Sequence, residues 1–196
     1  MAGVKLTVFL GSVRDGRNGN RVWKLVSSAA KELDLDVTLL DPLAMNTPPI
    51  TQPLHFMKDK SAAPAWMLET NEVIKNSDAF LVISSEYNCS IPPALSNLMD
   101  QFPPASYRHR PSGIVCYSMG NYGGCRAAML LRSFLSELGT VTVPAQATIP
   151  VVHQNISEEG EPVDPKWKAQ VTRMLSELKF YAEAIKQQKT KAGLPQ

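Results

Sequence analysis

The stretch Lys5-Leu-Thr-Val-Phe-Leu-Gly-Ser-Val-Arg-Asp-Gly-Arg-Asn-Gly-Asn20 decides the fold of this chain. Its first six residues form a short β-branched and apolar run, which predicts a buried strand. Gly11 opens a polar loop, and from Asn20 onward apolar residues recur at helical spacing. A buried strand that passes through such a loop into a helix is typical of a parallel α/β sheet.

The rest of the chain repeats this alternation of strand and helix. Further strands are predicted at 36–41, 79–83, 113–117 and 141–149, and helices at 20–33, 64–76, 93–102, 124–138 and 164–189. Five strands alternating with helices indicate a parallel sheet covered by helices on both faces. Residues 42–63 carry prolines at 42, 48, 49 and 53 and predict a long loop. We expect its first part, 42–57, and residues near 121–122 to form the rim of a binding site.

Length and composition describe one globular domain, predicted over 1–190 with a flexible tail at 191–196. The apolar fraction of 44% and the charged fraction of 19% exclude a disordered or coiled-coil protein. A net charge of +2 is too small to indicate a nucleic-acid partner. Because the N-terminus runs directly into a strand and no apolar run approaches the ~18 residues of a membrane span, we expect a cytoplasmic protein without a membrane partner.

The cysteines and histidines show no pattern typical of metal binding. Cys89, Cys116 and Cys125 are odd in number and form no CxxC, and the three histidines have no ligand spacing. We therefore expect neither a disulfide framework nor a metal site. Cys116 falls within a strand and is predicted to be a buried structural thiol, while packing is favoured over a redox role for the other two.

Residues 11–20 are a candidate anion site. A loop from strand to helix points backbone N–H groups and the positive end of the helix at one spot. Ser12 and Asn20 can donate hydrogen bonds there, and Arg14 and Arg17 can add charge-assisted ones. A phosphate dianion is the natural ligand, although a solvated basic turn that caps the helix explains the loop alone equally well.

Two nucleotide-binding motifs fail in this loop. The dinucleotide fingerprint GxGxxG is absent because Val13 occupies the second glycine position. The P-loop GxxxxGK[ST] is nearly met from Gly11 to Gly16, but Arg17 replaces its lysine and Asn18 its magnesium-binding hydroxyl. Hydrolysis of a nucleoside triphosphate is therefore not expected.

Two further polar loops follow predicted strands, at 84–92 and at Ser118-Met-Gly-Asn-Tyr-Gly-Gly-Cys125. Together with the first loop, they resemble the NADPH-dependent FMN reductase family. The family pattern P-E-Y-N-x-S-x-P-x-x-L-K-N-x-x-D is matched by Glu86, Tyr87, Asn88, Ser90, Pro92, Leu95, Asn97 and Asp100. Ser85 stands for the usual proline and Ser96 for the usual lysine, and neither change removes a binding group.

The resemblance, which runs from the first strand to about Ile149, implies a fold and an activity. The fold is a flavodoxin-like three-layer sandwich whose five-stranded parallel sheet has the order 2-1-3-4-5. The activity passes hydride from the co-substrate NADPH through bound FMN to a quinone or similar small acceptor by a ping-pong mechanism. No catalytic side chain is expected, because the cofactor carries the hydride chemistry. An FMN-binding electron carrier or redox sensor without turnover is an alternative, as is a phosphate-binding module without flavin.

The resemblance also assigns cofactor-binding residues. Gly11, Ser12, Arg14, Gly19 and Asn20 belong to the loop that would hold the FMN phosphate. Arg17 would help there or meet the phosphate of NADPH. Glu86, Tyr87 and Asn88 would line the isoalloxazine ring, largely through backbone groups, and Ser118, Gly120 and Gly123 would face its pyrimidine edge. For Glu86, a hydrogen bond toward a helix is favoured over proton transfer.

Members of this family commonly form dimers, and some form tetramers, so a homodimer or homotetramer is expected. The predicted helix 93–102 is the candidate interface. It carries Leu95, Leu98, Met99 and Phe102 on more than one face, and so could bury two faces.

Overall fold

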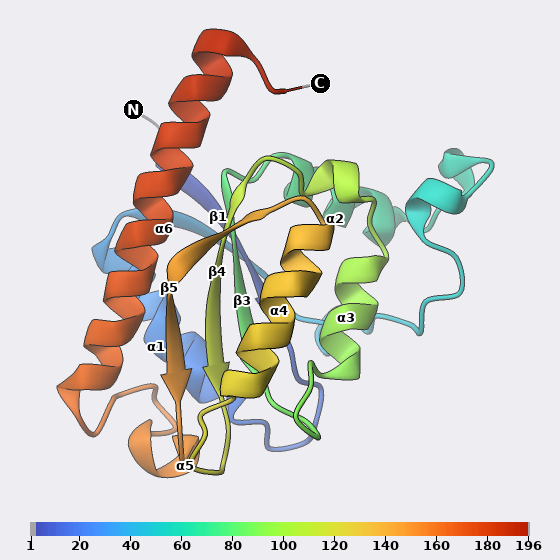
Figure 1. Ribbon diagram of the computed structural model, residues 1–196. Coiled ribbons are helices and arrows are strands. Elements are labelled where there is room, and N and C mark those ends of the chain that lie inside the picture. The colour runs from blue at the N-terminus through green and yellow to red at the C-terminus, as the bar shows by residue number, and fades with distance from the viewer. Residues whose placement is uncertain (1–2, 196) are drawn as a thin grey trace.

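A computed structural model describes residues 3–195, and its five strands form one parallel sheet with the order β2-β1-β3-β4-β5 (Figure 1). The strands are β1 (Val4–Leu10), β2 (Leu35–Leu40), β3 (Ala79–Ser85), β4 (Pro111–Tyr117) and β5 (Val141–Ile149). They agree with the predicted strands to within a residue or two. The strand order confirms the fold that the family resemblance implies.

Within residues 3–195, six α-helices surround this sheet: α1 (Gly19–Glu32), α2 (Ala65–Lys75), α3 (Pro93–Asp100), α4 (Cys125–Glu137), α5 (Val152–Asn155) and α6 (Pro165–Ala192). The buried residues of α1 and α6 pack on one face of the sheet, and those of α2, α3 and α4 pack on the other. The short α5 was not predicted, and α6 continues past its predicted end at Lys189 to Ala192. No helix of residues 3–195 is long and apolar enough to cross a membrane.

The central strands explain why the sequence folds this way. Every residue of β3 and β4 is buried, because helices cover both of their faces. The edge strand β2 alternates between half-buried and exposed residues instead, until its last residue, Leu40, which is buried. A continuous apolar run such as Ala79–Ile83 therefore identifies a strand in the middle of the sheet.

Helix α3 uses both of its apolar faces within the chain. Leu95, Leu98, Met99 and Phe102 are at most 1% exposed and belong to the core on the α2–α4 side. The second face that the sequence left for a partner is therefore covered by the chain itself.

The proline-rich segment lies along α3. Asn97 of α3 holds it by two hydrogen bonds, because its side-chain amide donates to the Pro48 carbonyl at 2.9 Å and its side-chain oxygen accepts from the Ile50 amide at 2.7 Å. Beyond this point the segment projects outward from α3 before it returns to the start of α2, as the cyan loop in Figure 1 shows. The segment is thus anchored to a helix on one face of the sheet.

Candidate functional site

A cleft of about 480 Å³ opens at the carboxyl edge of the sheet, between the loops that follow β1, β3 and β4. This edge is where the strand arrowheads gather in Figure 1. The cleft is lined by Ser12, Arg14, Asp15, Gly16, Arg17, Asn18, Ser85, Glu86, Tyr87, Asn88, Cys89, Tyr117, Ser118, Met119, Gly120, Tyr122 and Arg126. Its volume falls in the usual range of about 300–1,000 Å³ for cofactor and small-molecule sites.

Eight of the twelve residues predicted to bind the cofactor line this cleft: Ser12, Arg14, Arg17, Glu86, Tyr87, Asn88, Ser118 and Gly120. All three predicted loops contribute to it, because the carboxyl ends of parallel strands meet at one edge. No residue of 42–57 lines the cleft. The rim expected from 42–57 is therefore wrong, since the hydrogen bonds of Asn97 hold that segment along α3, whereas Tyr122, from the other expected part of the rim, lines the cleft.

The other four predicted residues shape the loops from behind the cleft. The Gly11 amide donates to the Ile83 carbonyl at 2.8 Å, which continues the pairing of β1 with β3. A Cβ at Gly19 would lie 2.8 Å from the buried Tyr117 hydroxyl, and one at Gly123 would lie 3.0 Å from the Pro150 nitrogen. Asn20 is exposed, and its side-chain oxygen accepts a hydrogen bond from Arg17 Nε at 2.9 Å.

The first loop presents unpaired donors at the start of α1. Within the part of the chain that the structure describes, the amides of Asn18 and Gly19 donate no hydrogen bond. They lie at the N-terminal end of a 14-residue helix, where partial positive charge favours an anion. The loop therefore has the donors that the sequence led us to expect for a phosphate.

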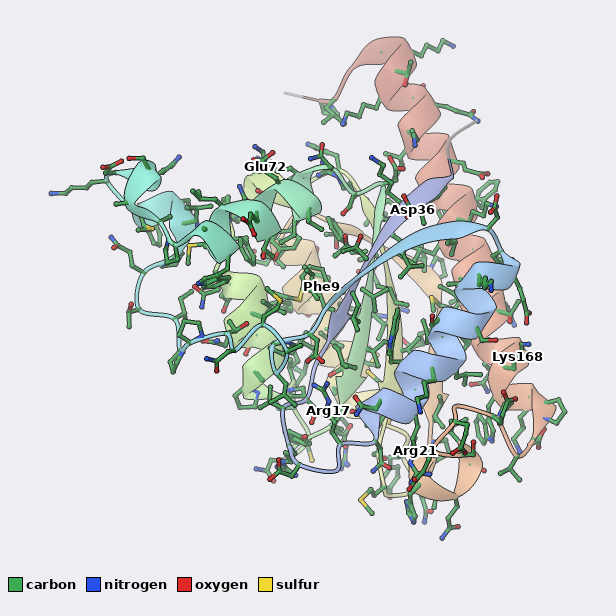
Figure 2. All side chains as sticks on the ribbon, turned by 180° about the vertical axis from the view of Figure 1, so that it is seen from behind. Phe9, Arg17, Arg21, Asp36, Glu72 and Lys168 are labelled. Atoms are coloured by element: carbon green, nitrogen blue, oxygen red, sulfur yellow. The ribbon has the colours of Figure 1, made fainter. Side chains whose placement is uncertain are left out.

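Arg17 holds the loop in place through Asp41. Its guanidinium pairs with the Asp41 carboxylate through both terminal nitrogens and also donates to the Ser12 carbonyl at 2.5 Å. The side chains are only 7% and 12% exposed. Burial raises the pKa of Asp41, but the hydrogen bonds from Arg17 and the Leu43 amide outweigh it and lower that pKa below its usual value. Figure 2 shows Arg17 beside the start of α1.

Arg14 and Tyr87 connect the first loop to the second. The guanidinium carbon of Arg14 lies 3.6 Å from the centroid of the Tyr87 ring. The Tyr87 hydroxyl lies 2.5 Å from Ser12 Oγ. The guanidinium of Arg14 makes no hydrogen bond to another residue of 3–195, so its donors are available to a ligand. Arg14, unlike Arg17, is therefore an unneutralised cation in the cleft.

The second loop contains a tight two-residue turn. The amide of Tyr87 donates to the Ser90 carbonyl at 3.1 Å, and the amide of Ser90 donates back at 2.9 Å. Asn88 and Cys89 between them have φ of 50° and 63°. Turns of this kind favour Asn followed by Gly, because both central residues adopt the left-handed region. Asn88 fits this preference, and Cys89 has a side chain where glycine is favoured.

Replacing Cys89 with glycine is expected to raise the free energy of unfolding by about 0.5–1 kcal/mol. Relief of the left-handed conformation is worth roughly 1–2 kcal/mol, and the greater freedom of glycine in the unfolded chain offsets part of it. Urea denaturation measures the change. Cys89→Ala is the matched control, because it removes the thiol and keeps the Cβ. Equal stability of the two variants would contradict a strained backbone at this position.

Glu86 joins the second loop to the third. Its side chain is 4% exposed, and the carboxylate accepts from the amides of Arg126 at 2.9 Å and Ala127 at 3.1 Å in the first turn of α4. It also accepts from Nε and Nη2 of Arg126. Burial raises the pKa of Glu86, but these hydrogen bonds outweigh it and lower the pKa below its usual value. Glu86 is therefore an ionised acceptor that binds the first turn of α4, in the hydrogen-bonding role that the sequence favoured.

Three residues important for this geometry were not predicted. Arg126 reads as an ordinary surface residue at the start of a helix, and Tyr117 reads as the last core residue of a strand. Asp41 had a detectable signal, because a carboxylate directly after β2 must lie beside the loop that follows its neighbour β1. The basic residues of that loop made such an ion pair a reasonable expectation.

Comparison with known proteins places the chain in a family. The model of the NADPH-dependent FMN reductase family matches residues 4–154. A quinone reductase from Escherichia coli strain K12 is 25% identical over 190 residues, which cover 93% of this chain and 97% of the relative. The chain belongs to the NADPH-dependent FMN reductase family and is an NAD(P)H-dependent oxidoreductase.

Solved structures share the same flavodoxin-like fold. FerB from Paracoccus denitrificans, a flavoenzyme NAD(P)H:(acceptor) oxidoreductase, superposes with a TM-score of 0.75 at 24% identity, covering 92% of this chain and 98% of its own. The apo form of the NADH:FMN oxidoreductase EmoB superposes with a TM-score of 0.66 at 15% identity, covering 90% of this chain and 89% of its own. At these identities the likeness concerns the fold.

Proposed function

We propose that the chain binds FMN in the cleft and uses NADPH to reduce a quinone or similar small acceptor by a ping-pong mechanism. The observation that carries the proposal is the first loop. Asn18, whose amide donates no hydrogen bond within residues 3–195, and Arg14, whose guanidinium is free there, both line a cleft of cofactor size. These donors fit the phosphate of FMN, and the two other loops supply walls for a flat ring system.

Each loop has its own part in holding the cofactor. Ser12, Arg14 and the open amides would bind the phosphate. The backbone of Glu86, Tyr87 and Asn88 would line the ring on one side, and Ser118 and Gly120 would lie at its pyrimidine edge. Bound FMN supplies hydride acceptance from a reduced nicotinamide and hydride donation to an acceptor.

The side chains of the protein bind and orient rather than transfer protons. Glu86 is ionised and fully engaged at the start of α4, so we assign it no acid role. Arg17 is neutralised by Asp41 and fixes the backbone of the loop, so the assistance to the phosphate that the sequence suggested comes from Arg14. Because one cleft serves both substrates, the oxidised nucleotide leaves before the acceptor enters.

A visible spectrum followed by anaerobic titration with NADPH tests this function. We expect the purified protein to carry FMN, or to take it up, and NADPH to bleach its absorbance until a quinone restores it. A colourless protein that takes up no FMN would overturn the proposal. NADPH oxidation no faster than with free FMN would leave the alternative of an electron carrier without turnover.

Replacing Arg14 with alanine is expected to weaken FMN binding by about 2 kcal/mol, the scale of a hydrogen bond to a charged group. Quenching of flavin fluorescence measures the affinity, with riboflavin as the control ligand because it lacks the phosphate. The loss should be confined to FMN. An unchanged FMN affinity would remove Arg14 from the phosphate site.

We further propose a homodimer or homotetramer and a cytoplasmic location. Met129 and Leu130 of α4 are exposed apolar side chains on the helix whose first turn borders the cleft, and they are candidates for an interface. All three cysteines are free thiols, as is usual in a reducing compartment. Light scattering coupled to gel filtration tests the assembly, and a monomer at micromolar concentration would overturn it.

A further inference from the structure

Arg126 lines the cleft with part of its guanidinium unused. Its Nε and Nη2 bind the Glu86 carboxylate, whereas Nη1 makes no hydrogen bond to any residue of 3–195. The side chain is 50% exposed, although that of Glu86 beneath it is 4% exposed. One edge of the guanidinium is thus anchored to Glu86, and the other edge has no protein partner on a side chain that lines the cleft and is half exposed.

Tyr122 lies beside this guanidinium. The Arg126 guanidinium carbon is 5.1 Å from the centroid of the Tyr122 ring, and the ring itself is 67% exposed. Both residues line the cleft. A cation and a flat aromatic surface are therefore presented together to a molecule that enters.

Arg126 differs from Arg17 in exposure and in its free donor. Both arginines pair with a carboxylate, but the Arg17 side chain is 7% exposed, whereas that of Arg126 is 50% exposed and keeps Nη1 without a partner in residues 3–195. The anchored fork of an arginine is ordered before a ligand arrives, which lowers the entropy lost on binding. The free edge is therefore suited to bind an anionic group.

The other two arginines of the cleft have different partners. Arg17 is neutralised by Asp41, and Arg14 belongs to the loop assigned to the FMN phosphate. Arg126 comes from the third loop and contacts neither of them in the hydrogen bonds of residues 3–195. It forms a separate cationic group of the cleft, at the end of the third loop.

We propose that Arg126 and Tyr122 form a binding site for an anionic group of the substrate that enters the cleft after the cofactor. This inference rests on the proposed function. A phosphate of the pyridine nucleotide and an acidic substituent of the acceptor share the required chemistry. Nη1 of Arg126 binds the anion, and the Tyr122 ring packs against the adjoining part of the molecule.

The test compares charged and neutral substrates with wild type, Arg126→Gln and Arg126→Lys. NADPH and NADH are the charged hydride donors, and N-benzyl-1,4-dihydronicotinamide is the neutral one. 1,2-Naphthoquinone-4-sulfonate and 1,2-naphthoquinone are the charged and neutral acceptors. Arg173→Gln is the matched control, because it removes the same charge from an exposed position on α6.

For each substrate class, the measured quantity is the KM of the charged substrate divided by the KM of the neutral one. We expect Arg126→Gln to raise this ratio about tenfold for either the hydride donors or the acceptors, and Arg126→Lys to raise it less. A raised KM ratio for NADPH alone identifies the 2′-phosphate as the group that binds Arg126. A raised ratio for both nucleotides identifies the pyrophosphate, and a raised ratio for the sulfonate identifies the acidic substituent of the acceptor. Calorimetric titration of the FMN-loaded protein with 2′,5′-ADP gives an independent affinity for the nucleotide phosphates.

Two outcomes would overturn the inference. One is an equal rise in KM for charged and neutral substrates, which would mean that Arg126 acts only by supporting Glu86 and the second loop. The other is no change in any ratio. The FMN affinity and the NADPH:quinone turnover of the wild type, measured on the same preparation, separate these outcomes from a failure of the proposed function, because that failure would leave either no FMN bound or no turnover above that of free FMN.

Discussion

Replacing Asp41 with alanine is expected to lower the free energy of unfolding by about 4 kcal/mol, the largest effect of any single change considered for this protein. The substitution leaves the Arg17 guanidinium, 7% exposed, without its counter-charge. Removing one partner of a buried ion pair costs more than the pair contributes, because the remaining charge stays desolvated. Urea denaturation measures the loss, and FMN affinity should fall with it because Arg17 also holds the Ser12 carbonyl.

Matched variants separate the charge of Asp41 from its shape. Asp41→Asn keeps the shape and loses the charge, and Asp36→Ala removes a carboxylate from an exposed position on β2 (Figure 2).

The pKa of Asp41 is lowered in the folded protein. The contribution of Asp41 to the free energy of unfolding is therefore complete above the unfolded pKa of about 3.9 and is lost as the pH falls through the folded pKa. Wild type and Asp41→Asn should therefore converge in stability in acid. A loss at Asp41→Ala no larger than at Asp36→Ala would contradict the buried pair.

Replacing Glu86 with alanine is expected to lower the free energy of unfolding by between about 2 and 3 kcal/mol. Two amides at the start of α4 lose their acceptor, and the anion that stabilises the positive end of that helix is removed. FMN affinity should fall as well, because the loop after β3 loses its connection to α4. Denaturant titration and flavin fluorescence measure the two effects.

Glu86→Gln is the control for charge, since it preserves the shape and one acceptor oxygen. The lowered pKa of Glu86 means that its contribution is complete above the unfolded value of about 4.3 and is lost as the pH falls through the folded value. The stability difference between wild type and Glu86→Gln should thus be constant near neutral pH and shrink in acid. A difference that persists unchanged in acid would show that the ionised carboxylate is not the stabilising group.

The fold could be predicted because its signals are local. Apolar runs such as Lys5–Leu10 and Ala79–Ile83 identify strands directly, and the rule that parallel strands end at one edge brings three polar loops together. This rule placed the loops, whereas the strand order and the individual binding residues came from the family resemblance; eight of those residues line the cleft.

The errors and omissions involve contacts between distant residues. The proline-rich segment has the composition of a binding loop, but two hydrogen bonds of Asn97 place it along α3. Arg126 has no signal in its own neighbourhood, because its position depends on Glu86, forty residues earlier in the chain. The extra apolar face of α3 indicated a partner, and the chain itself covers it.

The complete burial of β3 and β4 has a consequence for the entropy of ligand binding. Two of the cleft loops begin at the ends of these strands, and Gly11, at the start of the third, is hydrogen-bonded to Ile83 of β3. Local unfolding is rare in segments that have no exposed residue, so the first residues of all three loops are ordered before any ligand binds. Little backbone freedom is then left to lose when a cofactor binds, and most of the gross interaction energy is retained as affinity.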